Sequence, residues 1–275
     1  MPTLKIDVSG PADHLLFEGL PHLQPVIDEL GDGALLIGGL AATAWIGASE
    51  IGLPMRVTRD VDIGIDRRGL HLTAETRKVV PLLREQGFES LGGKRQFRFV
   101  KKTPAGEFLV DLLVAPGASR EEPPRLEADL QTLSAPGLAY AILRRPVPLS
   151  LELACDGETR QFELPIISLD SAFVMKAVLT AERRLQPDRR IADTSDAVML
   201  AAACATDEAH IAPLREHSRR KDVRTAVRWI SGSFSNRRTA AARRVERHFE
   251  LELGQPGGGA WAVSVAERFA RLLDG

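Results

Sequence analysis

The pattern of apolar and polar residues predicts alternating helices and strands in the first part of the chain. Apolar residues recur at helical spacing over His14–Leu30, and the sequence GDG at Gly31–Gly33 is a helix stop signal. The short apolar run Ala34–Ile37 predicts a buried strand, and the stretch after Gly38-Gly39 has the composition of a helix. Apolar residues alternate with aspartate and glycine over Val61–Ile65, which predicts a second strand.

Two hairpins are predicted further along the chain. Gln96–Val100 and Phe108–Val114 have strand composition and flank a turn-forming segment, KKTPAGE. Leu149–Ala154 and Gln161–Ile167 flank CDGETR, in which Asp156-Gly157 is a turn signal. We therefore expect four strands from these segments.

The composition changes near Leu169, beyond which Ala, Leu and Arg dominate. Before that point, a helix is expected over Leu70–Gln86, and the Pro-, Glu- and Gly-rich segment Ala115–Pro136 predicts an irregular connection. Beyond it, helices are expected over Ser171–Leu185, Ile191–Cys204, Asp207–His217, Lys221–Ile230, Arg237–Phe249 and Trp261–Leu273. The fold class is therefore α+β: a mixed sheet with flanking helices in residues 1–169, followed by a mainly helical domain in residues 170–275.

Composition narrows the class of protein. The chain has 275 residues, of which 44% are hydrophobic and 27% charged, as in ordinary globular proteins, and its net charge of -1 points to no class of partner. Two cysteines, Cys155 and Cys204, cannot form a disulfide framework or a zinc cage. The N-terminus lacks the pattern of a signal peptide, and the longest uncharged run, Ala34–Ser49, is shorter than a membrane span. We expect a cytoplasmic protein with no membrane segment.

Carboxylates on the predicted strands are the strongest chemical signal. Asp60 and Asp62 are two residues apart and point from one face of a strand, where they repel each other unless a cation lies between them. Asp111 is a lone acid in the apolar strand FLVDLLV, and burying it is costly without a partner. Gly38 and Gly39, at the start of a helix, would let backbone N–H groups approach a phosphate. The pattern favours a hard-cation site of the kind Mg²⁺ prefers.

The series LLIGGLAATAW, TRDVDIGI and FLVDLLV resembles the nucleotidyltransferase superfamily, whose signature is a glycine turn, a D-x-D pair and a third aspartate on a later strand. The TRDVD form and the helical second half are most similar to the AbiEii-like nucleotidyltransferases of type IV toxin–antitoxin systems. The resemblance implies a polymerase-β-like fold and transfer of a nucleoside monophosphate from a nucleoside triphosphate such as ATP. It implies that Asp60, Asp62 and Asp111 are catalytic and hold Mg²⁺ or Mn²⁺, and that Gly38 and Gly39 bind the nucleotide.

The second half carries further matches to this family. SAFVMKAVLTAERR resembles the family's helix that meets the triphosphate, which makes Lys176 and Arg183 nucleotide-binding candidates on a helical domain that closes the nucleotide cleft. Asp193 and Asp196 resemble the family's K-D-x-x-D element, although Ala192 stands where the lysine is usual. Their role stays open between that element and a structural one, such as capping or pairing with the arginines that precede them.

A basic segment leaves the acceptor open. Arg215–Arg247 contains eleven Lys or Arg and three acids, a net charge of +8, which suits the phosphate backbone of an RNA acceptor or a solvated arginine-rich face equally well. The family resemblance also allows a protein or small-molecule acceptor and an antitoxin protein as partner. The competing hypothesis is a non-catalytic nucleotide- or RNA-binding module of the same fold. The acidic triad favours the enzyme, because a binder has no need of carboxylates that repel phosphate.

Overall fold

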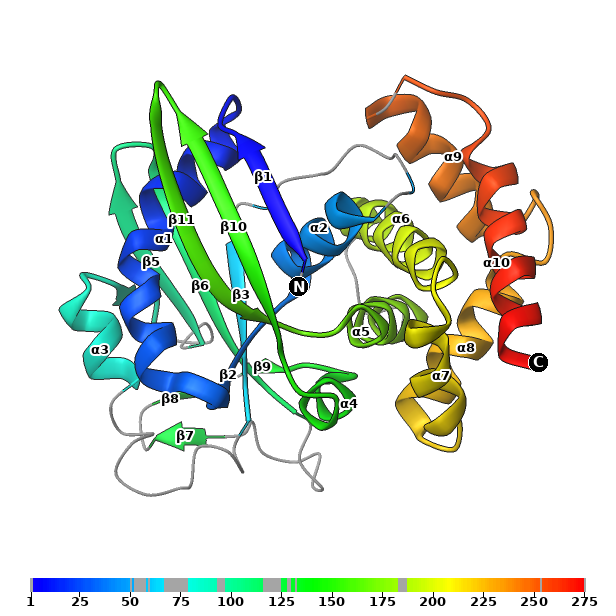
Figure 1. The fold of residues 1–275 in the computed structure, drawn as a ribbon, viewed down its shortest axis with the longest axis horizontal. Helices are drawn as coiled ribbons and strands as arrows, with labels where there is room; N and C mark the ends of the chain where they lie inside the picture. Colours follow the sequence, from blue (N-terminus) through cyan, green and yellow to red (C-terminus); the bar gives the residue numbers. More distant parts are fainter. Residues whose placement is uncertain are drawn as a thin grey trace. The chain divides into compact units, whose positions relative to one another are not determined.

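A computed structural model describes residues 2–49, 51, 58, 60–66, 79–92, 97–115, 125–127, 130–131, 133–182, 187–252 and 254–274 (Figure 1). The chain divides into two compact units. The first contains the described residues up to Ala44 and from Thr58 to Ile167, and the second contains the chain from Ser168 onward together with the end of helix α2 from Trp45. No described helix has both the length and the hydropathy that crossing a membrane requires.

The first unit is built on a mixed sheet. Within the described residues, nine strands form this sheet in the order β1-β10-β11-β2-β3-β6-β5-β4, with β9 beside β6 (Figure 1). Its strands are β1 (Thr3–Asp7), β2 (Ala34–Ile37), β3 (Asp60–Ile65), β4 (Glu89–Ser90), β5 (Arg98–Thr103), β6 (Gly106–Val114), β9 (Leu133–Ser134), β10 (Val147–Cys155) and β11 (Glu158–Ile166). Two short strands, β7 (Arg125–Glu127) and β8 (Leu130–Gln131), pair separately.

The central strands β2, β3 and β6 form the core of this sheet. Strand β3 pairs antiparallel with β2 and parallel with β6. All four residues of β2 are buried, and Val61, Ile63 and Ile65 on β3 are fully buried. Because side chains alternate across a strand, the aspartates of β3 point to the face opposite these apolar residues. The alternation of side chains along β3 therefore places the carboxylates of Asp60 and Asp62 on the same face of the sheet.

Helices complete the first unit: α1 (Pro11–Leu30), the short 3₁₀ turn η1 (Gly31–Gly33), the start of α2 (Gly38–Ala48), α3 (Val79–Glu85) and α4 (Leu138–Leu143). Helix α1 packs on β5, β6 and β11. Gly19 makes this approach close, since a Cβ there would lie 2.2 Å from Cγ of the fully buried Phe108. The lack of a side chain at Gly19 therefore allows α1 to pack closely against Phe108 of β6.

The second unit is helical, as predicted, with α5 (Leu169–Ala181), α6 (Pro187–Cys204), α7 (Glu208–Glu216), α8 (Lys221–Ser233), α9 (Ala240–Glu252) and α10 (Gly258–Asp274). Helix α5 contacts α6, α7 and α8 and is buried on almost all sides, which agrees with a sequence whose apolar residues are not confined to one face. Phe173 of α5 and Phe269 of α10 pack in this core with ring centroids 4.8 Å apart and their planes tilted by 56°. The α+β class, a mixed sheet followed by a helical part, is confirmed.

Several elements differ from the sequence predictions. Strands β7, β8 and β9 lie in the segment Ala115–Pro136, which was expected to be irregular, and the expected helix over Leu70–Gln86 is described only from Val79 to Glu85. Strand β5 continues to Thr103 and β6 begins at Gly106, so the first hairpin turn is much shorter than KKTPAGE. Strand β1 and helix α4 were not predicted, because both are short and β1 pairs with the distant β10.

Candidate metal centre

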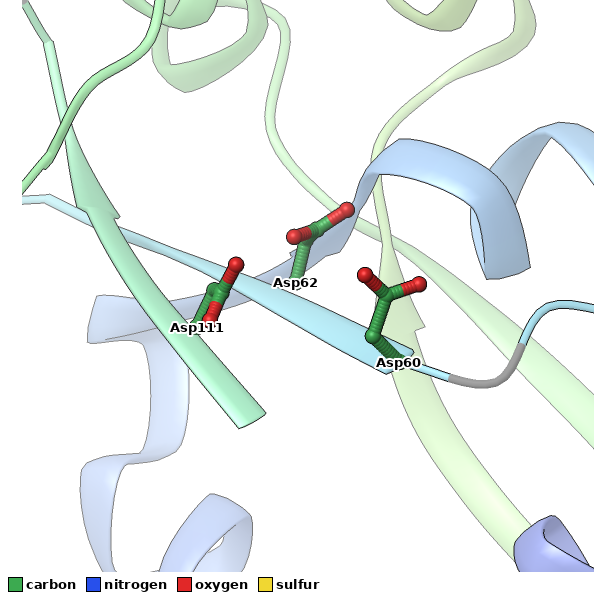
Figure 2. Close-up of side chains that lie close together, drawn as sticks. All are labelled: Asp60, Asp62 and Asp111. Atoms are coloured by element: carbon green, nitrogen blue, oxygen red, sulfur yellow. The ribbon is translucent and has the colours of Figure 1, made fainter. Parts of the chain in front are cut away.

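The three predicted aspartates converge on one face of the sheet (Figure 2). Asp62 of β3 and Asp111 of β6 are paired in register on neighbouring parallel strands, and Asp60 lies one pleat earlier on β3. One carboxylate oxygen from each residue can be chosen so that all lie within 4.8 Å of one another. Asp111 is buried, with 5% of its surface exposed. The structure thus brings together the three carboxylates that the sequence singled out.

Arg98 on β5 is part of this centre and was not predicted. The strand register pairs Arg98 with Asp111, and its Nε and Nη2 atoms donate to Oδ1 and Oδ2 of Asp111 at 2.6 Å each. Its Nη2 also lies 3.8 Å from Oδ2 of Asp60. The hydrogen bonds to Asp111 raise the pKa of the Arg98 guanidinium, and the charges of Asp60 and Asp62 add to this effect. Counting only Arg98 and the three aspartates, negative charges exceed positive charges by two when all four groups are ionised.

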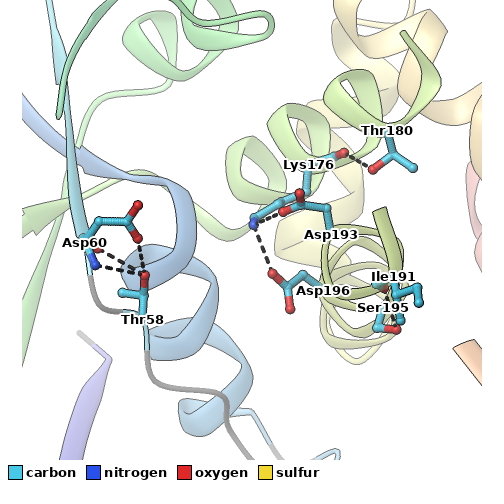
Figure 3. Close-up of polar contacts among 8 residues, drawn as sticks. All are labelled: Thr58, Asp60, Lys176, Thr180, Ile191, Asp193, Ser195 and Asp196. Atoms are coloured by element: carbon cyan, nitrogen blue, oxygen red, sulfur yellow. Dashed lines mark hydrogen bonds and ion pairs between the residues drawn. The ribbon is translucent and has the colours of Figure 1, made fainter. Parts of the chain in front are cut away.

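Thr58 fixes the carboxylate of Asp60. Its hydroxyl Oγ1 donates to Oδ1 of Asp60 at 2.7 Å and also lies 3.1 Å from the backbone oxygen of Asp60 (Figure 3). Thr58 is itself buried, with 6% of its surface exposed. A buried hydroxyl on one oxygen restricts the rotation of the carboxylate, so Asp60 is held in place before any ligand binds. Thr58 is the threonine of the TRDVD motif.

The two glycines between β2 and α2 lie against the centre. Gly38 has a φ of +67°, and a Cβ at this position would fall 1.8 Å from Oδ2 of Asp62. A Cβ on Gly39 would fall 2.9 Å from Oγ1 of Thr58. The structure therefore gives a steric reason for both glycines: the turn passes too close to Asp62 and Thr58 for a side chain. Nucleotide binding by Gly38 and Gly39 stays a prediction.

Lys176 lies in a buried ion cluster within the second unit (Figure 3). Its Nζ on α5 donates to Oδ1 of Asp193 at 2.5 Å and to Oδ2 of Asp196 at 2.9 Å, both on α6. Lys176 is buried, with 7% of its surface exposed. Burial alone would lower its pKa, but Asp196 and Asp193 more than offset this and raise the pKa above the usual value for lysine.

The cluster gives Asp193 and Asp196 a partner that the sequence did not indicate. The sequence left their role open between the family's K-D-x-x-D element and a structural one, such as capping or pairing with the arginines before them, and the structure pairs them with Lys176. Arg183, the other predicted nucleotide ligand, lies outside the described residues. The predicted contact of Lys176 with a nucleotide stays a prediction.

Comparisons with known proteins give one distant likeness. No family model matches the sequence, and a comparison with curated proteins finds no match. Among solved structures, the chain is similar to an antigenic nucleotidyltransferase-like protein from Paracoccidioides brasiliensis, with 16% sequence identity and a TM-score of 0.46. The alignment covers 80% of this chain and 87% of that protein. At this identity and TM-score, the likeness assigns neither a family nor an activity to the chain.

Proposed function

We propose that the chain is a metal-dependent nucleotidyltransferase that moves a nucleoside monophosphate from a nucleoside triphosphate to an acceptor. The observation that supports this most is the convergence of Asp60, Asp62 and Asp111 from neighbouring strands, beside the glycine turn that begins α2. The order of these features along the chain is that of the nucleotidyltransferase signature given above. The AbiEii-like subtype and a role as the toxin of a toxin–antitoxin pair rest on the sequence resemblance alone.

The donor set fits a divalent cation of the Mg²⁺ or Mn²⁺ type. These hard ions prefer carboxylate oxygens, and Asp60 and Asp62 of β3 with Asp111 of β6 each offer one oxygen, all within 4.8 Å of one another. The excess negative charge of the centre gives a second reason to expect a cation there. When bound, such an ion would polarise the α-phosphate and offset charge that develops on the attacking and leaving oxygens.

The residues of the chain itself have distinct parts in this proposal. Asp60 and Asp62 present fixed oxygens, with Asp60 held by Thr58. Asp111 completes the negative centre and is oriented by Arg98. The glycine turn places the first N–H groups of α2 beside Asp62, where a helix N-terminus favours a phosphate group. This arrangement suits a nucleotide bound through its phosphates and a metal ion.

The basic helices support RNA as the acceptor. Lys221, Arg224 and Arg228 are exposed along α8 at positions i, i+3 and i+7, so they lie on one face of the helix. Two of the three acids of the basic segment are engaged locally: Asp222 pairs with Arg220, and Glu246 accepts two backbone N–H groups, whereas Glu216 is exposed on α7. The exposed face of α8 is therefore positive, as binding to a phosphate backbone requires.

The function is tested by incubating the protein with each α-³²P-labelled nucleoside triphosphate, Mg²⁺ and either total RNA or a protein extract. The proposal predicts covalent label in RNA for at least one nucleotide, and no label when EDTA removes the metal. Nucleotide binding without any transfer would instead support the non-catalytic module. Label found only in protein would still support a nucleotidyltransferase, but it would refute RNA as the acceptor.

The RNA acceptor has its own test in the salt dependence of binding. Replacing Lys221, Arg224 and Arg228 together with Ala should weaken RNA binding and lower the slope of log K against log salt by about 2, since each lost phosphate contact removes roughly 0.7 from it. The control replaces Arg268 and Arg271, which are exposed on α10, with Ala, and so removes two positive charges instead of three. An unchanged slope in the α8 variant, or an equal change in the control, would mean that the α8 face is a solvated surface.

A further inference from the structure

The three carboxylates of the metal centre are not equivalent, because Arg98 engages one of them much more closely. Both oxygens of Asp111 accept hydrogen bonds from Arg98 at 2.6 Å, whereas the contact of Arg98 with Asp60 is a single one at 3.8 Å. A bidentate arginine–carboxylate pair is among the strongest charge-assisted interactions in proteins. Asp111 is therefore already bound to a cation that belongs to the chain.

The strand geometry holds Arg98 in this position. Strands β5 and β6 are joined by a tight turn, and their antiparallel register places Arg98 directly opposite Asp111. The Arg98 side chain is 18% exposed and that of Asp111 is 7% exposed, so water competes little for the pair. Guanidinium stays charged at any physiological pH. Arg98 is thus a permanent positive charge within the triad.

A divalent ion that used Asp111 as a ligand would have to displace this guanidinium or bind beside it. Displacement would break two short hydrogen bonds, and binding beside it would place like charges together. Arg98 obstructs Asp60 less than Asp111, because its contact with Asp60 is long and Thr58 holds Asp60 in place. Of the two carboxylates that Arg98 contacts, Asp60 is therefore the better ligand, and Asp62 lies beside it on the same face of β3.

We propose that Arg98 takes the place of a second cation at this centre, and that the free protein binds one divalent ion, held chiefly by Asp60 and Asp62. This inference rests on the proposed function, which supplies the metal. It makes Arg98 a positioning residue that orients Asp111 and sets the number of ions bound. The guanidinium of Arg98, and not a second ion, balances the charge of the third aspartate.

The number of bound ions is measured directly by titrating the full chain with Mn²⁺ and counting free Mn²⁺ by electron paramagnetic resonance. Wild type should bind one Mn²⁺ per chain. Arg98→Met, which removes the charge but keeps much of the side-chain length, should bind two, or bind one roughly tenfold or more tightly. The matched control is Lys102→Met, which removes the same charge from an exposed position on the same face of β5 and should still bind one ion.

A second variant keeps the inference testable if Arg98→Met fails to fold. Asp111→Asn should still bind one Mn²⁺, because Asp111 is not a principal ligand, whereas Asp62→Asn should lose the site. Two ions on wild type would overturn the inference and leave the proposed function standing. Loss of all binding in Asp111→Asn, or a second ion gained in Lys102→Met, would also overturn it. No bound ion on wild type would refute the proposed function itself.

Discussion

The ion cluster on α5 and α6 allows a prediction of stability. Lys176→Met replaces the ammonium group with an apolar side chain of similar length and leaves Asp193 and Asp196 without their shared cation. These aspartates have 9% and 4% of their surface exposed, so water cannot readily take over the role of the lysine. The substitution should therefore leave two neighbouring buried carboxylates that repel each other.

The magnitude follows from the burial. Removing one partner of a buried ion pair costs about 3–5 kcal/mol of unfolding free energy, because the remaining charge is uncompensated. For a chain of this size, about 1 kcal/mol corresponds to roughly 2–4 °C in melting temperature, so the melting temperature should fall by about 6 °C or more. Replacing all three residues, Lys176→Met with Asp193→Asn and Asp196→Asn, should recover much of the loss.

Thermal melting followed by circular dichroism at neutral pH measures this effect. The control is Arg271→Met, which removes an exposed charge on α10 and should change stability by less than about 0.5 kcal/mol. The pKa of Lys176 is raised in the folded chain, so its contribution is complete at neutral pH and is lost as pH rises beyond about 10. The stabilising role of the buried cluster would be refuted if Lys176→Met had the melting temperature of wild type. It would also be refuted if the triple variant were less stable than Lys176→Met.

Three further substitutions test other contacts. Gly38→Ala should lower the melting temperature and abolish Mn²⁺ binding, since its Cβ would overlap Oδ2 of Asp62; Gly31→Ala, at a positive φ with open space, is the control and should keep the metal site. Asp62→Asn should melt at or above wild type without metal, because repulsion in the triad falls, and should lose the rise in melting temperature that Mn²⁺ gives wild type. Glu246→Gln should be less stable at neutral pH: backbone N–H groups lower the pKa of Glu246, so its contribution is present above its unfolded pKa and disappears as pH falls below about 4. If wild type and Glu246→Gln differed in melting temperature by the same amount at pH 7 and at pH 3, this prediction would be contradicted.

The sequence predicts the triad because each of its aspartates carries a local signal. Asp60 and Asp62 are two apart in an alternating strand, and Asp111 interrupts an apolar one. No local signal shows that these two strands are neighbours, and the structure places them side by side, with Asp62 opposite Asp111. Strand β2 was predicted to its ends, whereas β10 and β11 extend further into the predicted turn CDGETR than expected, to Cys155 and from Glu158.

Arg98 was missed because the register of the first hairpin depends on its turn. A long KKTPAGE turn leaves the partner of Asp111 undefined. The two-residue turn of the structure pairs Thr103 with Gly106, and counting back along both strands then pairs Arg98 with Asp111. The sequence does contain this signal, but only once the turn length is known.

The partner of Lys176 could not be found from the sequence. Helical spacing shows which residues share a face of one helix, but not which helix that face packs against. Asp193 and Asp196 lie on α6, 17 and 20 residues from Lys176, and the packing of α5 against α6 decides their contact. Strand β1 was missed for a similar reason, because its pairing with β10 joins residues such as Lys5 and Glu152 that lie far apart in the chain.

The measurement that tests the proposed function most directly compares α- and γ-labelled nucleoside triphosphate with wild type and Asp62→Asn in the presence of Mg²⁺ and RNA. Transfer of a nucleoside monophosphate predicts that wild type attaches the α-label to RNA and releases the γ-label as pyrophosphate. It also predicts that Asp62→Asn attaches neither label to RNA, although its melting curve shows that the variant is folded. Equal transfer of the α-label by Asp62→Asn, attachment of the γ-label, or no transfer of any nucleotide by wild type when a protein extract is supplied as well as RNA would contradict the metal-dependent nucleotidyltransferase proposed for this chain.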